Sequence, residues 1–118
     1  MTRRGDIVII EFPFVDGGRG KNRPALVIQA DAGNQRLQNT IVSMISGNLR
    51  WAGQVATQVL VDPQTAQGRS SGLHGPSVVK CENLYTVRQQ DVLQTIGRLS
   101  TELMTEVETC LKASLGLT

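Results

Sequence analysis

The chain has 118 residues, of which 40% are hydrophobic and 19% are charged, and its net charge is +2. This composition excludes a disordered polyelectrolyte, and the length predicts one domain, residues 1–118, with a real hydrophobic core. Because only 3% of the residues are aromatic, a nucleic-acid surface built from stacked aromatic rings is also disfavoured.

The positive charge is concentrated in the first half of the chain. Residues 1–50 hold seven Arg and Lys against four Asp and Glu, whereas residues 51–118 hold five against six. A basic first half can attract an anionic polymer, and a solvated basic face explains the same charges equally well. Charge alone therefore does not decide between a binding surface and an ordinary one.

Cysteine and histidine are too few to form a familiar metal site. Cys81, Cys110 and His74 are the only residues of these types, and their spacing matches no usual zinc set. Both cysteines fall in apolar-patterned segments, where a free thiol behaves as a small hydrophobic group. We expect no disulfide, no metal and no cofactor.

The sequence shows no membrane or targeting segment. Residues 1–6 lead directly into a predicted strand, and the longest aliphatic runs have four residues, far fewer than a spanning helix needs. We therefore expect no membrane association and a cytoplasmic location.

The first 46 residues predict three strands. β-branched residues over 7–12 indicate the first strand, and a glycine-rich basic loop follows over 14–22. Pro24 lacks a backbone donor and should mark the start or edge of a second strand, which runs to about residue 30. Residues 31–34 predict a turn, and residues 40–46 alternate as a third strand.

The middle of the chain predicts shorter elements. A β-like pattern covers residues 54–61 and is followed by a connection rich in Gly and Ser over 64–76. Two short strands are expected at 77–81 and 84–87. A helical turn over 89–95 and a last short strand at 96–99 complete the pattern.

The C-terminal segment predicts an amphipathic helix between two clear end signals. Ser100 is a suitable N-cap, and Gly116 is a suitable terminator. An apolar stripe predicts packing against the core; it consists of Leu103, Val107, Cys110, Leu111 and Leu115. The expected fold class is mainly β with a C-terminal α-helix, in the form of a small, strongly curved antiparallel sheet.

Two neighbouring strands carry residues suited to phosphodiester chemistry. Arg23 directly precedes Pro24 at the mouth of an apolar run, and Ser46 ends the next predicted strand. Adjacent strands can bring such a permanent cation and a small hydroxyl to one edge of a sheet. Taken singly, each residue is more simply explained as a surface arginine or a strand-end cap.

Several motifs in a fixed order resemble the MazF/PemK family of toxin endoribonucleases. The resemblance covers nearly all of the chain. The matching segments are Arg4–Val8, the glycine-rich loop, Asn22–Gln29, Asn39–Val42 through Ser46, Gly72–Leu73, Ser77–Val79 and Ile96–Leu99. The resemblance implies an SH3-like barrel of the MazF/PemK/CcdB plasmid-maintenance toxin type. It also implies a homodimer that cleaves single-stranded RNA at a short sequence without a metal, and that is inhibited by a cognate antitoxin.

The same resemblance implies roles for individual residues. Arg23 takes the place of the family's catalytic arginine, and Ser46 that of its catalytic hydroxyl, which is usually threonine. Thr40 is a second candidate hydroxyl, at the opposite end of the same strand. The expected substrate contacts are Arg19, Lys21, Pro24, Gln29 and Thr40.

Alternatives remain open for both the activity and the proton acceptor. The same barrel occurs in CcdB-like toxins, which bind DNA gyrase through a tryptophan near the chain end, whereas Trp51 here lies mid-chain. A chain that keeps the fold and only binds protein or RNA is a third possibility. Arg23 before Pro24 argues against both. His74 and Glu11 are possible proton acceptors, but an ordinary surface residue is the better explanation of each.

Overall fold

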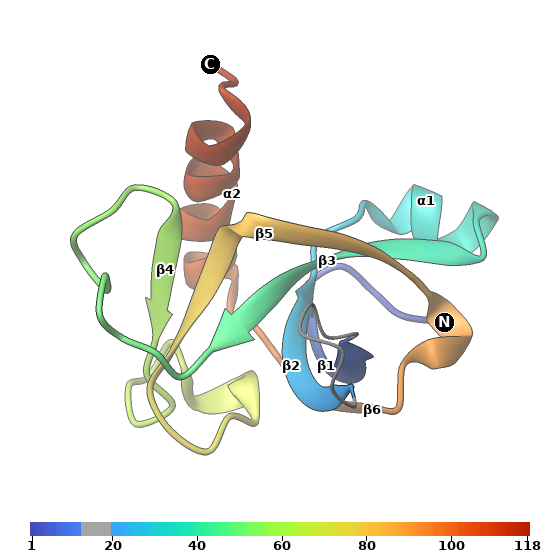
Figure 1. Cartoon of the computed structure of the whole chain (residues 1–118), viewed down its shortest axis with the longest axis horizontal. Helices are drawn as coiled ribbons and strands as arrows, with labels where there is room; N and C mark the ends of the chain where they lie inside the picture. The colour runs from blue at the N-terminus through green and yellow to red at the C-terminus, as the bar shows by residue number, and fades with distance from the viewer. Residues whose placement is uncertain (13–19) are drawn as a thin grey trace.

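The computed structural model describes residues 1–12 and 20–118, and its main element is a six-stranded sheet in the order β4–β5–β3–β2–β1–β6. All paired neighbours run antiparallel. The strands are β1 (Asp6–Phe12), β2 (Lys21–Val27), β3 (Asn39–Ser46), β4 (Gln58–Val61), β5 (Ser77–Arg88) and β6 (Gln94–Arg98). The helical elements are α1 (Asp31–Arg36), α2 (Thr101–Leu115) and the single turns η1 (Arg69–Ser71) and η2 (Gln89–Asp91). Figure 1 shows the sheet curling into a half-barrel, with α2 at one side. The predicted mainly β fold with a C-terminal helix is confirmed.

Helix α2 begins and ends where its end signals predict. The Ser100 hydroxyl accepts a hydrogen bond from the Leu103 backbone N–H at 3.2 Å, and Gly116 closes the helix with a left-handed φ of 69°. The first half of the predicted stripe packs as expected, because Leu103 and Val107 are buried. Leu115 does not, since the helix runs past the sheet and leaves this side chain 55% exposed. Within residues 1–12 and 20–118, neither α1 nor α2 has the length and apolar character needed to cross a bilayer.

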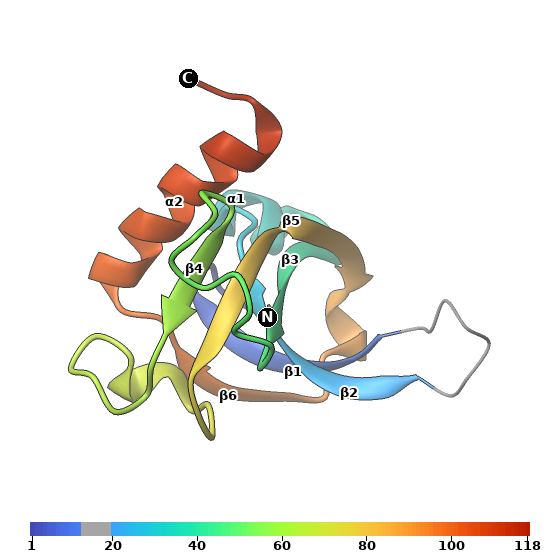
Figure 2. The same cartoon turned by 60° about the vertical axis from the view of Figure 1, so that its left-hand side comes forward.

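The two faces of the sheet carry separate apolar clusters. The face toward α2 includes Ile7, Leu26 and Ile45, whereas the opposite face includes Val8 and Ala25. Because successive residues of a strand point to opposite faces, β1 and β2 contribute to both clusters. We call these the helix face and the barrel face. Figure 2 shows β1 and β2 continuing beyond the body of the sheet as a two-stranded ribbon.

Strand β2 starts earlier than predicted, and Pro24 lies within it. The strand begins at Lys21, and Pro24 pairs with Ile9 of β1. Pairing with β3 involves only the last three residues of β2, from Ala25 onward. The first half of β2 is therefore an edge, which explains why a residue without a backbone N–H is tolerated there.

Strand β5 is one long strand and not the two short strands predicted. Its pairing with β3 shifts register between Ser43 and Met44, so Leu84 and Lys80 face successive residues of β3. The intervening residues of β5 bulge out of the ladder and bend the strand. The Ser43 hydroxyl donates to the Lys80 carbonyl at 2.7 Å, which supplies one of the hydrogen bonds that the bulge removes from the ladder.

Three other predicted boundaries were wrong. Strand β4 covers only Gln58–Val61, because residues 50–54 and 56–57 form turns. Strand β6 starts at Gln94, two residues early, and the predicted helical turn shrinks to η2. The segment after β2 forms the short helix α1 where a turn was expected. Each difference follows from tertiary contacts that local patterns do not encode.

The two cysteines are free thiols, Cys81 on β5 and Cys110 on α2. Cys81 is fully buried, and Cys110 is half-buried. Burial raises the pKa of the Cys81 thiol to about 12, with smaller contributions from Cys110 and Glu82. Cys81 is therefore a protonated core residue at neutral pH.

Candidate active site

Extending the register of the sheet aligns Arg23, near the start of β2, with Ser46, the last residue of β3. Ala25 pairs with Met44, and continuing this register by two residues aligns Arg23 with Ser46. Residues aligned across antiparallel strands share a face, so both belong to the barrel face with Ala25 and Met44. The pairing of β2 with β3 stops at Ala25 and Met44, so no ladder joins the two strands beyond this point. A half-buried cation and a half-buried hydroxyl thus flank one gap.

The neighbours of Arg23 on β1 and β2 are known from the same register. Arg23 pairs with Ile10, which is 1% exposed. This apolar neighbour supports the stem of the arginine on one side. Lys21 stands two residues before Arg23 on the same face and is exposed. Two cations therefore follow each other along this edge of β2.

The hydroxyl of Ser46 has one hydrogen bond that leaves its proton available. Its Oγ accepts from the backbone N–H of Asn48 at 3.1 Å, and the Asn48 side-chain oxygen accepts from the Arg50 N–H at 3.1 Å. This turn fixes the chain directly after β3. Because Ser46 acts as acceptor in that bond, its own O–H can still donate to a ligand.

Lys80 is a further cation on this face that sequence reasoning missed. It pairs with Met44 on β3 and with Gln58 on β4, and Val78, two residues earlier, pairs with Ser46. Lys80 therefore shares the barrel face with Arg23 and lies one strand beyond Ser46. The only sequence signal was a lysine inside an apolar strand pattern, and its position depends on the register shift in β5.

An edge-to-face aromatic pair closes the barrel face beside these cations. The rings of Phe12 and Tyr85 lie 5.0 Å apart at an interplanar angle of 67°. Phe12 is buried and Tyr85 is 40% exposed. The amide of Asn83 lies 3.8 Å from the Met44 sulfur on the same side. We call the part of the barrel face that carries Lys21, Arg23 and Lys80 the cationic end of the sheet. Packed apolar side chains lie next to it.

The other predicted contacts occupy different places. Arg19 lies outside the described residues. Pro24 lies on the helix face, opposite to Arg23, where it lines a groove with His74. Glu11 is exposed and, by strand alternation, shares the helix face with Ile9. Both possible proton acceptors therefore lie on the helix face, whereas Arg23 belongs to the barrel face.

Gln29 and Thr40 belong to a buried polar corner at the far end of β3. Thr40 is fully buried, and its hydroxyl donates to the Asn34 side-chain oxygen at 2.6 Å. The Gln29 amide donates to the same oxygen at 2.9 Å and to the Asn39 carbonyl at 3.0 Å. These side chains hold α1 against β3. These hydrogen bonds give both residues a structural role, and a contact of either with the substrate stays a prediction.

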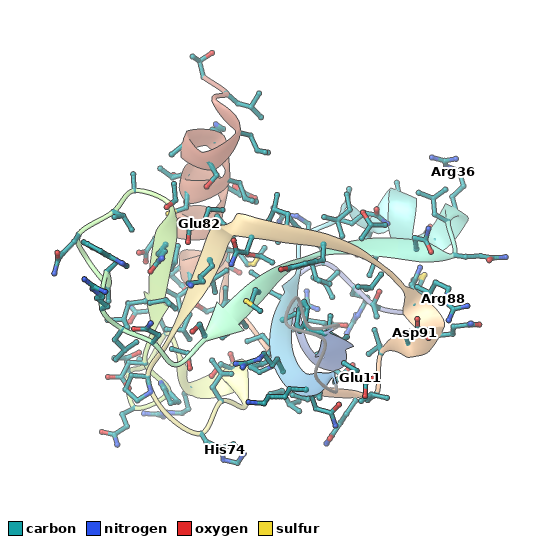
Figure 3. All side chains as sticks on the ribbon, viewed as in Figure 1. Glu11, Arg36, His74, Glu82, Arg88 and Asp91 are labelled. Carbon is teal, nitrogen blue, oxygen red and sulfur yellow. The ribbon has the colours of Figure 1, made fainter. Side chains whose placement is uncertain are left out.

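Asp31 also belongs to this corner, and the pKa of its carboxyl group is lowered there. The Arg4 backbone N–H donates to its carboxylate at 2.7 Å, and the Asn34 amide donates at 3.3 Å. The Arg4 hydrogen bond is the main cause that lowers the pKa of Asp31 below its ordinary value of 3.8, with a smaller contribution from Asn34. Figure 3 places this end of the molecule, marked by Arg36 on α1, away from His74.

Comparison with known proteins gives a family match over almost the whole chain. Residues 3–115 match the family described as PemK-like, MazF-like toxins of type II toxin–antitoxin systems. The chain is 31% identical over 118 residues to endoribonuclease EndoA of Bacillus subtilis strain 168, covering 99% of this chain and 97% of that protein.

Solved structures show the same architecture. The Mycobacterium tuberculosis toxin MazF-mt6 superposes with a TM-score of 0.76 at 27% identity, covering 96% of this chain and 98% of that one. A mycobacterial endoribonuclease solved with its cognate antitoxin gives a TM-score of 0.80 at 19% identity, covering 100% of this chain and 98% of that one. The curled sheet with its terminal helix is thus the fold of the MazF toxins.

The chain belongs to the MazF/PemK family of toxin endoribonucleases from type II toxin–antitoxin systems. The gyrase-directed CcdB alternative is not favoured by these matches.

Proposed function

We propose that this toxin cleaves single-stranded messenger RNA at a short sequence, without a metal, near the start of β2 and the end of β3. The supporting observation is the register that aligns Arg23 with Ser46 across the gap between these strands. In the proposed step the 2′-oxygen of one nucleotide attacks the adjacent phosphorus, and the bond from phosphorus to the 5′-oxygen breaks. The 2′-hydroxyl loses its proton and the leaving 5′-oxygen gains one, which yields a 2′,3′-cyclic phosphate and a 5′-hydroxyl.

Arg23 stabilises the negative charge that develops on the phosphate. Its planar guanidinium can donate two parallel hydrogen bonds to phosphate oxygens and remains charged at any working pH. The packed Ile10 beneath it holds the stem, so little reorganisation is needed during the reaction. One preorganised donor of this kind supplies roughly 3–4 kcal/mol of transition-state stabilisation.

Ser46 and the lysines complete the phosphate-binding surface. The Ser46 hydroxyl donates to the phosphate that Arg23 holds, while its oxygen stays fixed by Asn48. Serine has more rotamer freedom than the usual threonine, and the Asn48 contact offsets part of this freedom. Lys21 and Lys80, on the same face, bind neighbouring phosphates and set the path of the strand.

The proton acceptor is not assigned to His74 or Glu11. Both lie on the helix face, whereas Arg23 and Ser46 belong to the barrel face. A general base must reach the proton that it removes within about 3 Å or through one water. Their positions therefore give no support to either role.

We also propose a cytoplasmic homodimer that is inhibited by an acidic antitoxin segment. Family membership supports the dimer, and a fold relative was solved together with its cognate antitoxin. The basic first half of this chain would attract the carboxylates of such a segment as it attracts phosphates. Antitoxin and RNA should then compete for the same cations.

The product ends test the proposed reaction most sharply. A purified sample is mixed in EDTA with a long RNA and with the same RNA carrying a 2′-deoxy nucleotide at the main cut site. We expect cleavage of the first, a cyclic phosphate mass on the upstream fragment, and no cut at the substituted position. A 5′-phosphate product, or cleavage that survives the 2′-deoxy substitution, would overturn the mechanism.

A further inference from the structure

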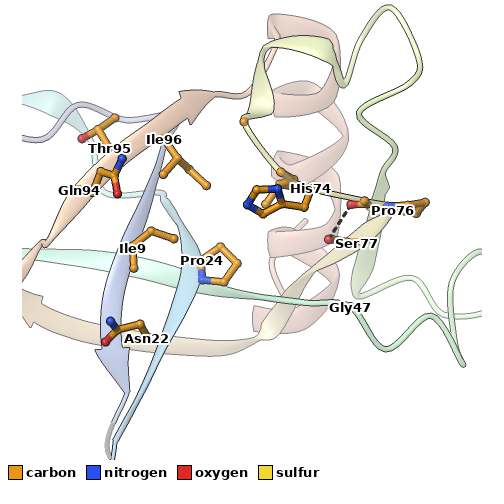
Figure 4. A pocket seen from close by; sticks show the side chains of 13 residues that line it. Ile9, Asn22, Pro24, Gly47, His74, Pro76, Ser77, Gln94, Thr95 and Ile96 are labelled. Carbon is orange, nitrogen blue, oxygen red and sulfur yellow. Dashed lines mark hydrogen bonds between the residues drawn. The ribbon is translucent and has the colours of Figure 1, made fainter.

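A groove of about 780 Å³ opens beside the proposed reaction site on the helix face of the sheet. Its floor is formed by β1, β2 and β6, and its far wall by the connection that leads into β5. Figure 4 shows His74 on this wall, with its ring directed across the groove toward Pro24 and Ile96. The volume lies in the range of ordinary small-ligand sites.

The residues that line the groove suit an uncharged, flat ligand that has polar atoms along its edge. Ile9, Pro24 and Ile96 supply apolar surface, and the amides of Asn22 and Gln94 lie at one side. Among the residues that the structure describes, none that lines the groove is Asp, Glu, Lys or Arg. Such a lining does not suit a phosphate, which needs cations, but it does suit a nucleobase.

Residues that line the groove are direct sequence neighbours of both proposed catalytic residues. Asn22 and Pro24 directly flank Arg23, and Gly47 directly follows Ser46. The pairing of β2 with β3 ends at Ala25, so no ladder joins the two strands where groove and phosphate site meet. A nucleotide whose phosphate contacts Arg23 can therefore place its base across this gap into the groove.

The wall opposite β2 is held rigidly, so the groove exists before a ligand binds. Gly72 has a left-handed φ of 73°, and a Cβ there would lie 2.0 Å from the Ile96 carbonyl oxygen. A Cβ on Gly97 would lie 2.3 Å from the Ser71 backbone. The Ser70 hydroxyl also donates to the Arg98 carbonyl at 2.6 Å. Close backbone packing thus fixes this connection to β6.

We propose that this groove is a nucleobase subsite for a nucleotide next to the cleaved bond and that it sets part of the sequence specificity. The inference rests on the proposed ribonuclease function. Single-stranded RNA is recognised through unstacked bases whose edges accept and donate hydrogen bonds, and Asn and Gln amides match base edges with paired hydrogen bonds. The apolar floor covers the face of the base, Asn22 and Gln94 read its edge, and His74 covers its open side.

Two substitutions change the groove without touching Arg23, Ser46 or the core. Gln94→Ala removes an exposed amide. Gly75→Phe adds a bulky side chain at a residue that lines the groove, and a Cβ at this glycine meets no atom within 4 Å. Gln35→Ala on α1 and Ala66→Phe in an exposed turn are the matched controls.

The test combines cleavage mapping with direct binding. Cut sites in a randomised RNA pool are sequenced for each variant, and amide chemical shifts of the wild type are recorded with a 2′-deoxy oligonucleotide of the preferred sequence. We expect Gln94→Ala to weaken discrimination at one position beside the cut by about tenfold, corresponding to ~1.4 kcal/mol. Gly75→Phe should reduce cleavage at preferred sites by about tenfold or more, and shifts should cluster at Thr95 and Ile96.

The outcomes separate this inference from the proposed function. If the wild type cuts RNA and both groove variants keep its rate and base preference, the subsite is refuted while the ribonuclease assignment stands. If the variants lose only affinity for an acidic antitoxin peptide, the groove serves that protein and the proposal is equally overturned. If no RNA is cut but the oligonucleotide still shifts Thr95 and Ile96, the reaction fails and the base site survives.

Discussion

The two ends of β3 carry similar hydroxyl residues, but these differ in burial and in their hydrogen bonds. At one end, Thr40 is fully buried and donates at 2.6 Å to Asn34, which is itself 2% exposed. At the other end, Ser46 is half-exposed and stands opposite Arg23, where no ladder joins β2 and β3. The hydroxyl of Thr40 already donates its proton to a hydrogen bond inside the protein, whereas the hydroxyl of Ser46 can still donate to a ligand. This difference in burial and hydrogen bonding, and not residue type, distinguishes the two hydroxyls.

The difference also predicts how each end responds to mutation. Loss of a buried, bonded partner leaves other polar groups unsatisfied and lowers stability. Loss of the half-buried cation Arg23 should lower activity and leave the fold intact. Substitutions at the two ends should therefore affect separate measurements.

The largest effect is expected for Arg23→Ala. Removing the guanidinium should lower kcat/KM for RNA cleavage by about a hundred- to a thousandfold, since one preorganised donor to a developing charge is lost. The free energy of unfolding should change by less than about 0.5 kcal/mol, because the side chain contributes little to the core. Single-turnover cleavage and urea unfolding measure the two quantities. Arg36→Ala, at an exposed position of α1, is the control and should change neither.

At the opposite end, Asn34→Ala should lower stability and spare activity. The substitution removes the acceptor of both Thr40 and Gln29 and the amide that bonds the Gln29 carbonyl at 3.1 Å. We expect a loss of roughly 2–4 kcal/mol in the free energy of unfolding, with the cleavage rate per folded molecule within twofold of the wild type.

The control for this variant is Asn39→Ala. The Asn39 backbone carbonyl accepts the Gln29 bond, so replacing its exposed side chain keeps that contact. Its stability should match the wild type. An Asn34→Ala protein that unfolds normally but no longer cleaves RNA would invert the comparison between the two ends.

Lys80→Ala should have a smaller effect, confined to the cationic end. One lost phosphate contact should lower cleavage about tenfold at moderate salt, and the slope of log affinity against log salt should fall by about 0.7 for a single strand. Fluorescence anisotropy with a labelled, uncleavable RNA over a salt series measures this slope. Lys112→Ala, near the end of α2, provides the matched control. An unchanged slope would show that Lys80 lies away from the RNA path.

The smallest effect concerns Asp31 and is visible only in acid. Hydrogen bonds from Arg4 and Asn34 lower its pKa below 3.8 in the folded protein, so the unfolded chain binds the proton more readily. Its contribution to stability is therefore present above about pH 3.8 and is lost as the pH falls through the folded pKa. Urea unfolding of wild type and Asp31→Asn between pH 2.5 and 6 should show curves that converge at the acidic end. A constant difference would contradict this linkage.

Local signals in the sequence were sufficient for the elements with strong caps and periodicity. Strand β1 and helix α2 fall where their patterns predict, because Ser100 and Gly116 fix the helix ends through nearby backbone groups. The Arg23 and Ser46 pair could be proposed early, since it needs only that consecutive strands are neighbours.

The rest depends on contacts between distant residues. The register shift of β5 opposite Ser43 and Met44 joins the two expected strands into one. The same shift brings Lys80 to the cationic end. Helix α1 lacks a side-chain N-cap and is held by the Asn34 corner. Thr40 and Ser46 are both strand hydroxyls, and only burial and bonding partners reveal that one is structural. Patterns along the chain do not contain this information.

The most direct test of the active-site assignment is a crystal structure with an RNA whose cut site carries a 2′-deoxy nucleotide. We expect the uncleaved phosphate within hydrogen-bond distance of both the Arg23 guanidinium and the Ser46 hydroxyl, near the start of β2 and the end of β3. A scissile phosphate bound elsewhere, with Arg23 and Ser46 both out of reach, would contradict it.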